Sequence, residues 1–349
     1  MMLVILRQLT TLNYRNLQDQ SISFQQGIHS ISGLNGQGKT NVLEAIYLVL
    51  TGVVDASRLQ QLVRFEETEA YVKAALERDE GQSIAEVGIG RGKRLMKLDG
   101  VRVKSAELLR GGAVFIAPED SEIVFGSPSV RRKFMDDLLS RISARYAQAL
   151  DLYQKNLAQR NAALKNDEQW ALEVFDAKLT ELGTVVMDLR QRSIQKIQRY
   201  ASAAHEKIGG RGELSIFLQE TTSIEGYARD FLLKRSEEFA RQSTVIGPHR
   251  DDLVLNLRGQ PASDYASRGE ARTIALALRY AEYELLYERY QENPILLIDD
   301  FSAELDPERR TALIELAKRS PQALITGTEP LPYAEHHYQM QGGTLERIQ

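Results

Sequence analysis

The chain of 349 residues contains no cysteine and only one tryptophan. The absence of cysteine excludes disulfide bonds and thiolate metal sites, and it is typical of proteins that work in a reducing cytosol. No apolar run approaches the roughly 18–20 residues needed to cross a bilayer. The first ten residues lack the apolar core and cleavage site of a signal peptide. We therefore expect a cytoplasmic protein without a membrane partner.

An excess of charge of one sign is also lacking, since 44 lysines and arginines stand against 48 acidic residues, a formal net charge of −4. A chain with this balance does not bind polyanions over its whole surface, so any nucleic-acid interface must be local. The five histidines show no spacing typical of metal ligands. At this length we expect two domains and a sizeable core.

A phosphate-binding pattern, GxxxxGK followed by Ser or Thr, stands near the start of the chain. An apolar run with a short polar break, from Ile28 to Ile31, precedes it and a helix-like segment at 39–50 follows, which is the context that the motif requires. Glycines let backbone N–H groups approach phosphates at a helix N-terminus. The residues expected to bind ATP here are Gly33, Asn35, Gly36, Gln37, Gly38, Lys39, Thr40 and Asn41. Lys39 would reach the β and γ phosphates, and the Thr40 hydroxyl would bind Mg²⁺.

A second nucleotide motif lies far downstream, where the apolar run 295–298 ends in Asp299 and Asp300. Continuous aliphatic sequence is typical of a buried parallel strand, and ligands bind at the carboxyl ends of such strands. We expect Asp299 to hold Mg²⁺ opposite Thr40, and Asp300 to orient the attacking water or accept its proton. A strand that merely ends in a turn is the alternative, and the P-loop weighs against it.

A helix start precedes this strand, and its residues are Ser267, Arg268, Gly269 and Glu270. Serine with glutamate three positions later is a capping box, so one interpretation is a well-capped helix and nothing more. In the other interpretation, the Ser267 hydroxyl, Gly269 and the exposed backbone N–H groups bind the γ-phosphate of ATP on a second subunit. Asp306, in the segment 302–306 after the strand, would add to that contact. This order resembles the signature helix, Walker B strand and D-loop of ABC ATPases.

The resemblance becomes specific in motifs that run in order from residue 13 to residue 306. They are Asn13-Tyr14-Arg15-Asn16-Leu17, residues 36–47, Ala117-Pro118-Glu119-Asp120, Gly126-Ser127-Pro128 followed by Arg131-Arg132, Gly247-Pro248-His249-Arg250-Asp251-Asp252-Leu253, Ser267-Arg268-Gly269 and residues 299–306. On these residues the chain resembles the RecF family, bacterial recombination-repair ATPases related to SMC and Rad50 heads. The resemblance implies an α/β ABC-ATPase-like fold, ATP and Mg²⁺ as cofactors, and Arg15 as a further nucleotide contact. An arginine in a turn at a strand edge is the alternative for Arg15.

The same resemblance implies an ATP-dependent homodimer that clamps DNA at gaps or junctions during bacterial, nucleoid-associated recombinational repair. Partners of the RecO and RecR type would then promote recombinase loading. Two departures from the wider ABC pattern, Asp300 in place of glutamate and no histidine after 323–326, predict slow hydrolysis that serves as a switch. The alternatives are a scaffold switched by ATP and a transporter subunit, and the long insert argues against the second.

The pattern of apolar residues divides the chain into an outer part and an insert. Short β-like runs with one helix occupy 1–126, and α/β sequence returns over 245–349, so we expect these parts to form one ATPase head. The insert, 127–244, is predicted to be helical, with apolar residues spaced by three and four. We expect two helices of roughly 30 residues, which form either a short antiparallel coiled-coil-like arm or a packed bundle.

The first part of the insert is basic. Between residues 127 and 166, eight lysines and arginines stand against three acids, a balance of +5. Such a run is most often a solvated helix face, and the alternative is a surface for the DNA backbone. No aromatic ladder for base stacking accompanies it, which favours duplex contact over single-strand readout. The residues expected to bind DNA are Arg131, Arg132, Lys133, Arg141 and Arg145.

Overall fold

Strand β3 (Gly27–Ser32), which leads into the P-loop, pairs with strands from the opposite end of the chain. The computed structural model describes residues 4–53, 56–78, 81–104, 112–300 and 307–348. One sheet has the order β15-β14-β3-β13-β12-β8 and is parallel except for the pair β14–β15. Its other strands are β8 (Ala113–Ile116), β12 (Ile295–Ile298), β13 (Gln322–Gly327), β14 (His336–Gln341) and β15 (Thr344–Arg347). The carboxyl ends of β3, β13 and β12 therefore lie side by side.

A second sheet, of order β2-β1-β4-β5-β6-β7, is antiparallel throughout. Its strands are β1 (Val4–Leu12), β2 (Gln20–Ser23), β4 (Glu69–Arg78), β5 (Gly81–Gly90), β6 (Lys93–Leu98) and β7 (Val101–Val103). Buried side chains alternate with more exposed ones along β4 and β5, as a sheet covered on one face requires. Between β6 and β7, Asp99 and Gly100 have φ of 50° and 79°, which fits the hairpin turn of an Asp-Gly pair.

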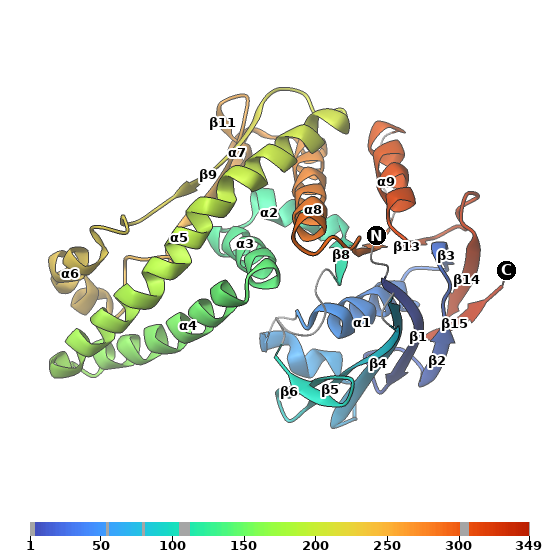
Figure 1. The fold of residues 1–349 in the computed structure, drawn as a ribbon, viewed down its shortest axis with the longest axis horizontal. Helices are drawn as coiled ribbons and strands as arrows, with labels where there is room; N and C mark the ends of the chain where they lie inside the picture. Colours follow the sequence, from blue (N-terminus) through green and yellow to red (C-terminus); the bar gives the residue numbers. More distant parts are fainter. Residues whose placement is uncertain (1–3, 54–55, 79–80, 105–111, 301–306, 349) are drawn as a thin grey trace. The chain divides into compact units, whose positions relative to one another are not determined.

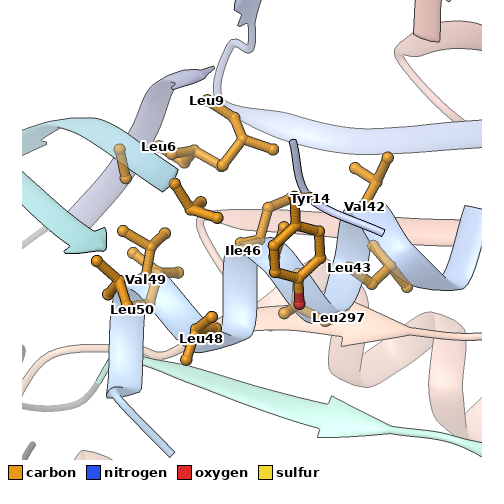
Figure 2. Close-up of a cluster of buried hydrophobic side chains, with 14 of the residues drawn as sticks. Leu6, Leu9, Tyr14, Val42, Leu43, Ile46, Leu48, Val49, Leu50 and Leu297 are labelled. Atoms are coloured by element: carbon orange, nitrogen blue, oxygen red, sulfur yellow. The ribbon is translucent and has the colours of Figure 1, made fainter. Parts of the chain in front are cut away.

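Helix α1 (Lys39–Thr51) packs against strands of both sheets. Figure 2 shows its apolar side chains, among them Ile46 and Val49, in one cluster with Leu6 and Leu9 of β1 and Leu297 of β12. All of these side chains are buried, and each contributes roughly 1.5–3 kcal/mol by leaving water. The core therefore fixes the helix that carries the P-loop lysine. Helix α9 (Pro307–Arg319) lies beside β3 and β13, and short 3₁₀ turns span 56–62 and 118–121.

The chain divides into two compact units, and Figure 1 labels most of their elements. Unit 1 comprises residues 1–120, 204–210 and 275–349, and unit 2 comprises 121–203 and 211–274. Both outer parts of the chain thus contribute to unit 1. The return to unit 1 lies later than the expected residue 245, because β10 (Asp252–Leu257) pairs with β9 (Leu214–Gln219) of the insert. Helix α8 (Arg268–Tyr290) begins in unit 2 and ends in unit 1.

Unit 2 is largely helical, but its helices differ from the two that we expected. Its remaining elements are α2 (Glu122–Phe125), α3 (Pro128–Ile142), α4 (Ala144–Lys165), α5 (Gln169–Lys207), α6 (Tyr227–Arg241), β11 (Gln260–Pro261) and α7 (Ala262–Tyr265). Ser143 interrupts the first helix, because its backbone is extended (φ −142°) and its side chain caps α4 by accepting from the Tyr146 N–H. Tyr153 of α4, Leu179 of α5 and Phe231 of α6 share one buried cluster. Three helices therefore pack together in this unit.

No helix in the described ranges is both long enough and apolar enough to cross a membrane. The segment 302–306, with the predicted D-loop residue Asp306, lies outside the described residues. The role of Asp306 therefore stays a prediction.

Candidate nucleotide-binding site

The P-loop connects β3 to α1 within unit 1. Gly36 and Gly38 have φ of 79° and 112°, and a Cβ at Gly38 would lie 2.9 Å from Asn16 Oδ1, so a side chain is excluded there. Lys39 is 9% exposed, and its Nζ donates to the carbonyl of Gly33 at 2.7 Å and to the next carbonyl at 3.0 Å. The loop thus holds an ammonium group at a helix N-terminus, which is the arrangement that binds phosphates.

Neighbouring segments hold the P-loop in shape. In the turn between β14 and β15, the Gly343 N–H donates to the Gln37 carbonyl (3.1 Å), and the Gly342 N–H donates to Gln37 Oε1 (2.7 Å). Asn16 Nδ2 donates to the Gly36 carbonyl at 3.2 Å, while Asn41 Nδ2 donates to Asn16 Oδ1 at 2.7 Å. The side chains of Gln37 and Asn41, expected to bind ATP, therefore also support the loop. Asn16 is a positioning residue that the sequence showed only as part of a longer motif.

The structure brings Thr40 and the first aspartate after β12 together, although 259 residues separate them. Thr40 Oγ1 donates to Asp299 Oδ2 at 2.7 Å. A hydroxyl and a carboxylate at this distance suit Mg²⁺, which binds through one or two protein oxygens together with phosphates and water. No larger cluster of metal-ligating side chains occurs among the described residues, and a nucleotide-linked Mg²⁺ needs none. Thr40 and Asp299 are thus the residues that would hold the ion.

Thr326, at the carboxyl end of β13, links the two aspartates. Its Oγ1 donates to Asp299 Oδ1 at 2.5 Å and accepts from the Asp300 N–H at 2.9 Å. Asp300 has φ of 50°, so its backbone turns sharply after the strand. Sequence analysis missed Thr326. This polar residue lies at the carboxyl end of β13, between β3 and β12, where ligands bind in parallel sheets.

The helix start at Ser267 is the capping box that the sequence predicts. The Ser267 N–H and Oγ both donate to Glu270 Oε2 at 2.9 Å, and the Glu270 N–H donates back to Ser267 Oγ at 3.2 Å. Arg258 Nη1 donates to Glu270 Oε1 at 2.7 Å. This hydrogen bond, followed by that from the Ser267 N–H, lowers the pKa of Glu270 to about 2. Ser267 and Arg268 are exposed and Gly269 is partly exposed, so a binding partner can reach this helix start.

Comparisons with known proteins identify the family. The family model described as "RecF/RecN/SMC N terminal domain" matches residues 5–337. The DNA replication and repair protein RecF of Deinococcus radiodurans is 54% identical over 345 residues, which cover 99% of this chain and 96% of the relative. The chain belongs to the RecF family. The RecF of Bacillus cytotoxicus is 35% identical over 334 residues, which cover 90% of each chain.

Solved structures agree with this assignment. One described as the "recombination mediator protein RecF-ATP in RecFOR pathway" matches with a TM-score of 0.92 and 31% identity, covering 99% of this chain and 98% of that one. An SMC head domain from Pyrococcus furiosus matches with a TM-score of 0.55 and 19% identity, covering 99% and 96%. The second likeness shows the fold alone. The RecF-family chain described here therefore has the α/β ABC-ATPase-like fold of SMC heads.

Arg15, which the family resemblance suggests as a nucleotide contact, is held beside the P-loop helix. Its Nη2 lies 2.8 Å from Glu44 Oε2, and its Nη1 donates to Asn41 Oδ1 at 3.0 Å. The Arg15 N–H also donates to the Leu62 carbonyl at 2.9 Å. The guanidinium group is therefore fixed over the first turns of α1, and a direct contact with ATP remains a prediction.

Replacing Thr326 with valine is expected to lower the ATPase turnover number of this RecF-family protein about tenfold. Valine keeps the shape of the side chain but removes two hydrogen bonds. The bond to the Asp299 carboxylate is worth about 1.5–3 kcal/mol because its acceptor is charged, and the bond from the neutral Asp300 N–H is worth about 0.5–1.5 kcal/mol. Steady-state phosphate release at saturating ATP measures the effect. Thr326→Ser, which retains the hydroxyl, is the control and should stay within about threefold of the wild type. Equal loss in both variants would mean that packing at residue 326, not hydrogen bonding, matters.

Two of the five residues expected to bind DNA are buried. Arg131 is 8% exposed, and its Nε and Nη2 each donate to a carboxylate oxygen of Asp252 at 2.8 Å. Arg141 is 9% exposed. A buried guanidinium in a bidentate ion pair cannot turn to a phosphate without leaving its partner unpaired. The burial of Arg131 and Arg141 therefore weighs against this expectation, and a DNA contact by either residue stays a prediction.

The remaining three residues differ in exposure. Arg132 is partly buried and donates to the Asp251 carbonyl at 2.6 Å. Lys133 is exposed and pairs with Asp137 one helical turn away at 2.7 Å, and Arg145 is exposed. Only Lys133 and Arg145 therefore remain as surface cations of the original set, and a DNA contact at these residues stays a prediction.

Proposed function

We propose that this RecF-family protein is an ATP-switched DNA-binding protein of recombinational repair. The observation that carries the proposal is the Thr40–Asp299 hydrogen bond, which joins the end of the P-loop to the carboxyl end of β12. Relatives over most of the chain are DNA replication and repair proteins, and one solved relative is described with ATP in the RecFOR pathway. The names of these relatives support DNA, together with proteins of the RecO and RecR type, as partners of this protein.

The proposed switch is a homodimer that ATP holds together. The P-loop of one subunit binds the phosphates, while Ser267, Gly269 and the first N–H groups of α8 on the other subunit meet the γ-phosphate. The exposure of Ser267 and its preformed capping box support this role, because the helix N-terminus is ordered before it meets the phosphate. Two such sites around a two-fold axis would bury the nucleotides, and the dimer would clamp DNA. ATP shifts the equilibrium because it binds the dimer more tightly than the monomer.

Slow hydrolysis would then reset the clamp. Asp300 is proposed to orient or deprotonate the attacking water, and bound Mg²⁺ would stabilise charge on the phosphates. An aspartate is one methylene shorter than the glutamate of typical ABC ATPases, which supports a weak, DNA-stimulated ATPase. DNA gaps or junctions are the proposed substrate, where partners of the RecO and RecR type load recombinase.

The molar mass in solution tests the switch. Light scattering is measured with and without ATP and Mg²⁺ for the wild type, Asp300→Asn and Ser267→Arg. ATP should double the mass of the wild type, Asp300→Asn should prolong the dimer, and Ser267→Arg should abolish it while monomers still bind ATP. A wild type that binds ATP but remains monomeric would contradict the homodimer and favour the alternative, an ATP-switched scaffold for repair or replication partners.

A further inference from the structure

The antiparallel sheet of unit 1 carries a cationic surface outside the residues first expected to bind DNA. Residues 88–104, which run from the end of β5 through β6 and β7, contain six lysines and arginines and one acid, Asp99. The whole chain has a net charge of −4, so this stretch departs from the average. Such local accumulation is the electrostatic signature of a polyanion site.

The strand register shows which of these cations share a face. Lys97 of β6 lies directly opposite Arg102 of β7, and Lys93 lies four residues before Lys97 and therefore on the same face. Met96, next to Lys97, is buried and faces the core that contains α1. Lys93 and Arg102 are exposed and Lys97 is partly exposed. The three cations thus lie on the outward face, with Lys93 and Lys97 about 13 Å apart along the strand.

These three side chains form no ion pair within the described part of the chain. Neither an ion pair nor a hydrogen bond joins the side chains of Lys93, Lys97 or Arg102 to any residue in the described part of the chain. Like charges directly opposite on neighbouring strands are destabilising, so an external anion beside the Lys97–Arg102 pair would stabilise the sheet. Two carboxylates share this face: Glu86 lies directly opposite Lys97 and accepts a hydrogen bond from Tyr71, and Glu69 lies in the cross-strand row of Lys93.

Exposed cations of unit 2, in contrast, form ion pairs within the protein. Lys133 pairs with Asp137 and Lys155 pairs with Asp151, each at 2.7 Å on the same helix. Their charges are therefore partly neutralised within the protein, which is the usual state of a solvated helix face. The cations of the sheet are the stronger candidates for an external polyanion.

The outward face is also open at its centre. Gly88 of β5 lies opposite Tyr71 of β4 and Leu95 of β6, and a Cβ built on it would meet no atom within 4 Å. Glycine in the interior of a strand often marks a place where a ligand or another backbone approaches closely. A flat centre beside spaced cations fits a broad, rigid polyanion better than a small anion in a pocket.

We propose that this face, defined by Lys93, Lys97, Arg102 and Gly88, binds the phosphate backbone of duplex DNA. Duplex DNA carries one charge per about 1.7 Å of its axis, so cations spread over about 13 Å can each neutralise a different phosphate. Along the cross-strand rows of this face, within the described residues, there is no series of exposed aromatic rings. This favours contact with the DNA backbone over base stacking. The inference rests on the proposed function and gives the DNA-binding activity a location.

The test compares the wild type with the triple variant Lys93→Gln, Lys97→Gln, Arg102→Gln. Binding of a fluorescent duplex in the presence of a non-hydrolysable ATP analogue is followed over a salt series. Three lost phosphate contacts should make the slope of log affinity against log salt shallower by about 2.7 and weaken binding on the order of 100-fold near 0.1 M salt. The charge-matched control is Lys178→Gln, Arg192→Gln, Lys234→Gln, all exposed residues of unit 2, and it should retain the wild-type slope.

A second variant, Gly88→Glu, places one negative charge at the open centre without a steric clash and should weaken DNA binding at least tenfold. ATP-driven dimerisation of every variant, measured by light scattering, shows that the fold and the nucleotide site are intact. Unchanged affinity and slope in the triple variant, or equal loss in the matched control, would overturn the location and leave the proposed function standing. A wild type that binds no duplex at all would instead overturn the DNA-binding function itself.

Discussion

Replacing Lys39 with methionine is expected to weaken ATP binding on the order of 100-fold and to abolish the ATP-driven dimer. The ammonium group is nearly buried, and the carbonyl of Gly33 holds it against the P-loop at 2.7 Å. Hydrogen bonds to charged groups contribute about 1.5–3 kcal/mol each, and the lysine is placed to make them to two phosphates. Titration calorimetry with ATP and Mg²⁺ measures the affinity, and light scattering measures the dimer.

Lys178→Met provides the matched control, because Lys178 is an exposed lysine of α5 that pairs with Glu181 on its own helix. This control should bind ATP and dimerise like the wild type. If Lys39→Met retained both properties, the assignment of residues 33–40 as the phosphate site would be wrong.

Replacing Arg160 with methionine is expected to destabilise unit 2 by about 3–5 kcal/mol, the cost of breaking a buried ion pair. Arg160 is fully buried and donates to Asp176 at 2.7 Å, to Glu238 at 2.6 Å and to Thr244 at 2.8 Å. Its guanidinium group also lies 4.5 Å from the ring centroid of Phe231. Methionine fills much of the volume but leaves the Glu238 carboxylate buried without its cation. Urea unfolding, followed by circular dichroism of the helices, gives the change in midpoint.

The control for this prediction lies on the same helix. Lys155 is exposed and pairs with Asp151 one turn away, and exposed pairs contribute about 0–1 kcal/mol. Lys155→Met should therefore shift the unfolding midpoint little. A loss below 1 kcal/mol in Arg160→Met would show that the network adds no net stability beyond a packed apolar side chain.

Arg160 also illustrates what the sequence could not show. It was counted among eight cations of a basic helical stretch, yet it is buried, as are Arg131 and Arg141. A charge count along a helix does not indicate which cations have partners. Asp252, the partner of Arg131, lies 121 residues away in the chain, so only the folded structure reveals the pair.

The nucleotide motifs could be predicted because their chemistry depends on local spacing. The P-loop needs glycines at fixed positions before Lys39, and the capping box needs Glu270 three residues after Ser267. The meeting of Thr40 with Asp299 followed from the order of these motifs in a parallel sheet. Thr326 was missed because a single threonine at a strand end forms no pattern of its own. The break at Ser143 was missed because the apolar spacing continues across it.

The position of β3 between β13 and β14 has a consequence for how the protein is made. A ribosome synthesises residues 27–32 early, but the strands that pair with both edges of β3 comprise residues 322–327 and 336–341. At 5–20 residues per second, these partners emerge roughly 15–60 seconds later. Over that interval β3 has no native neighbour, and the turn that supports Gln37 does not yet exist. The nascent chain must therefore keep β3 unpaired over this interval, and the supported P-loop can form only after residues 336–343 have been synthesised.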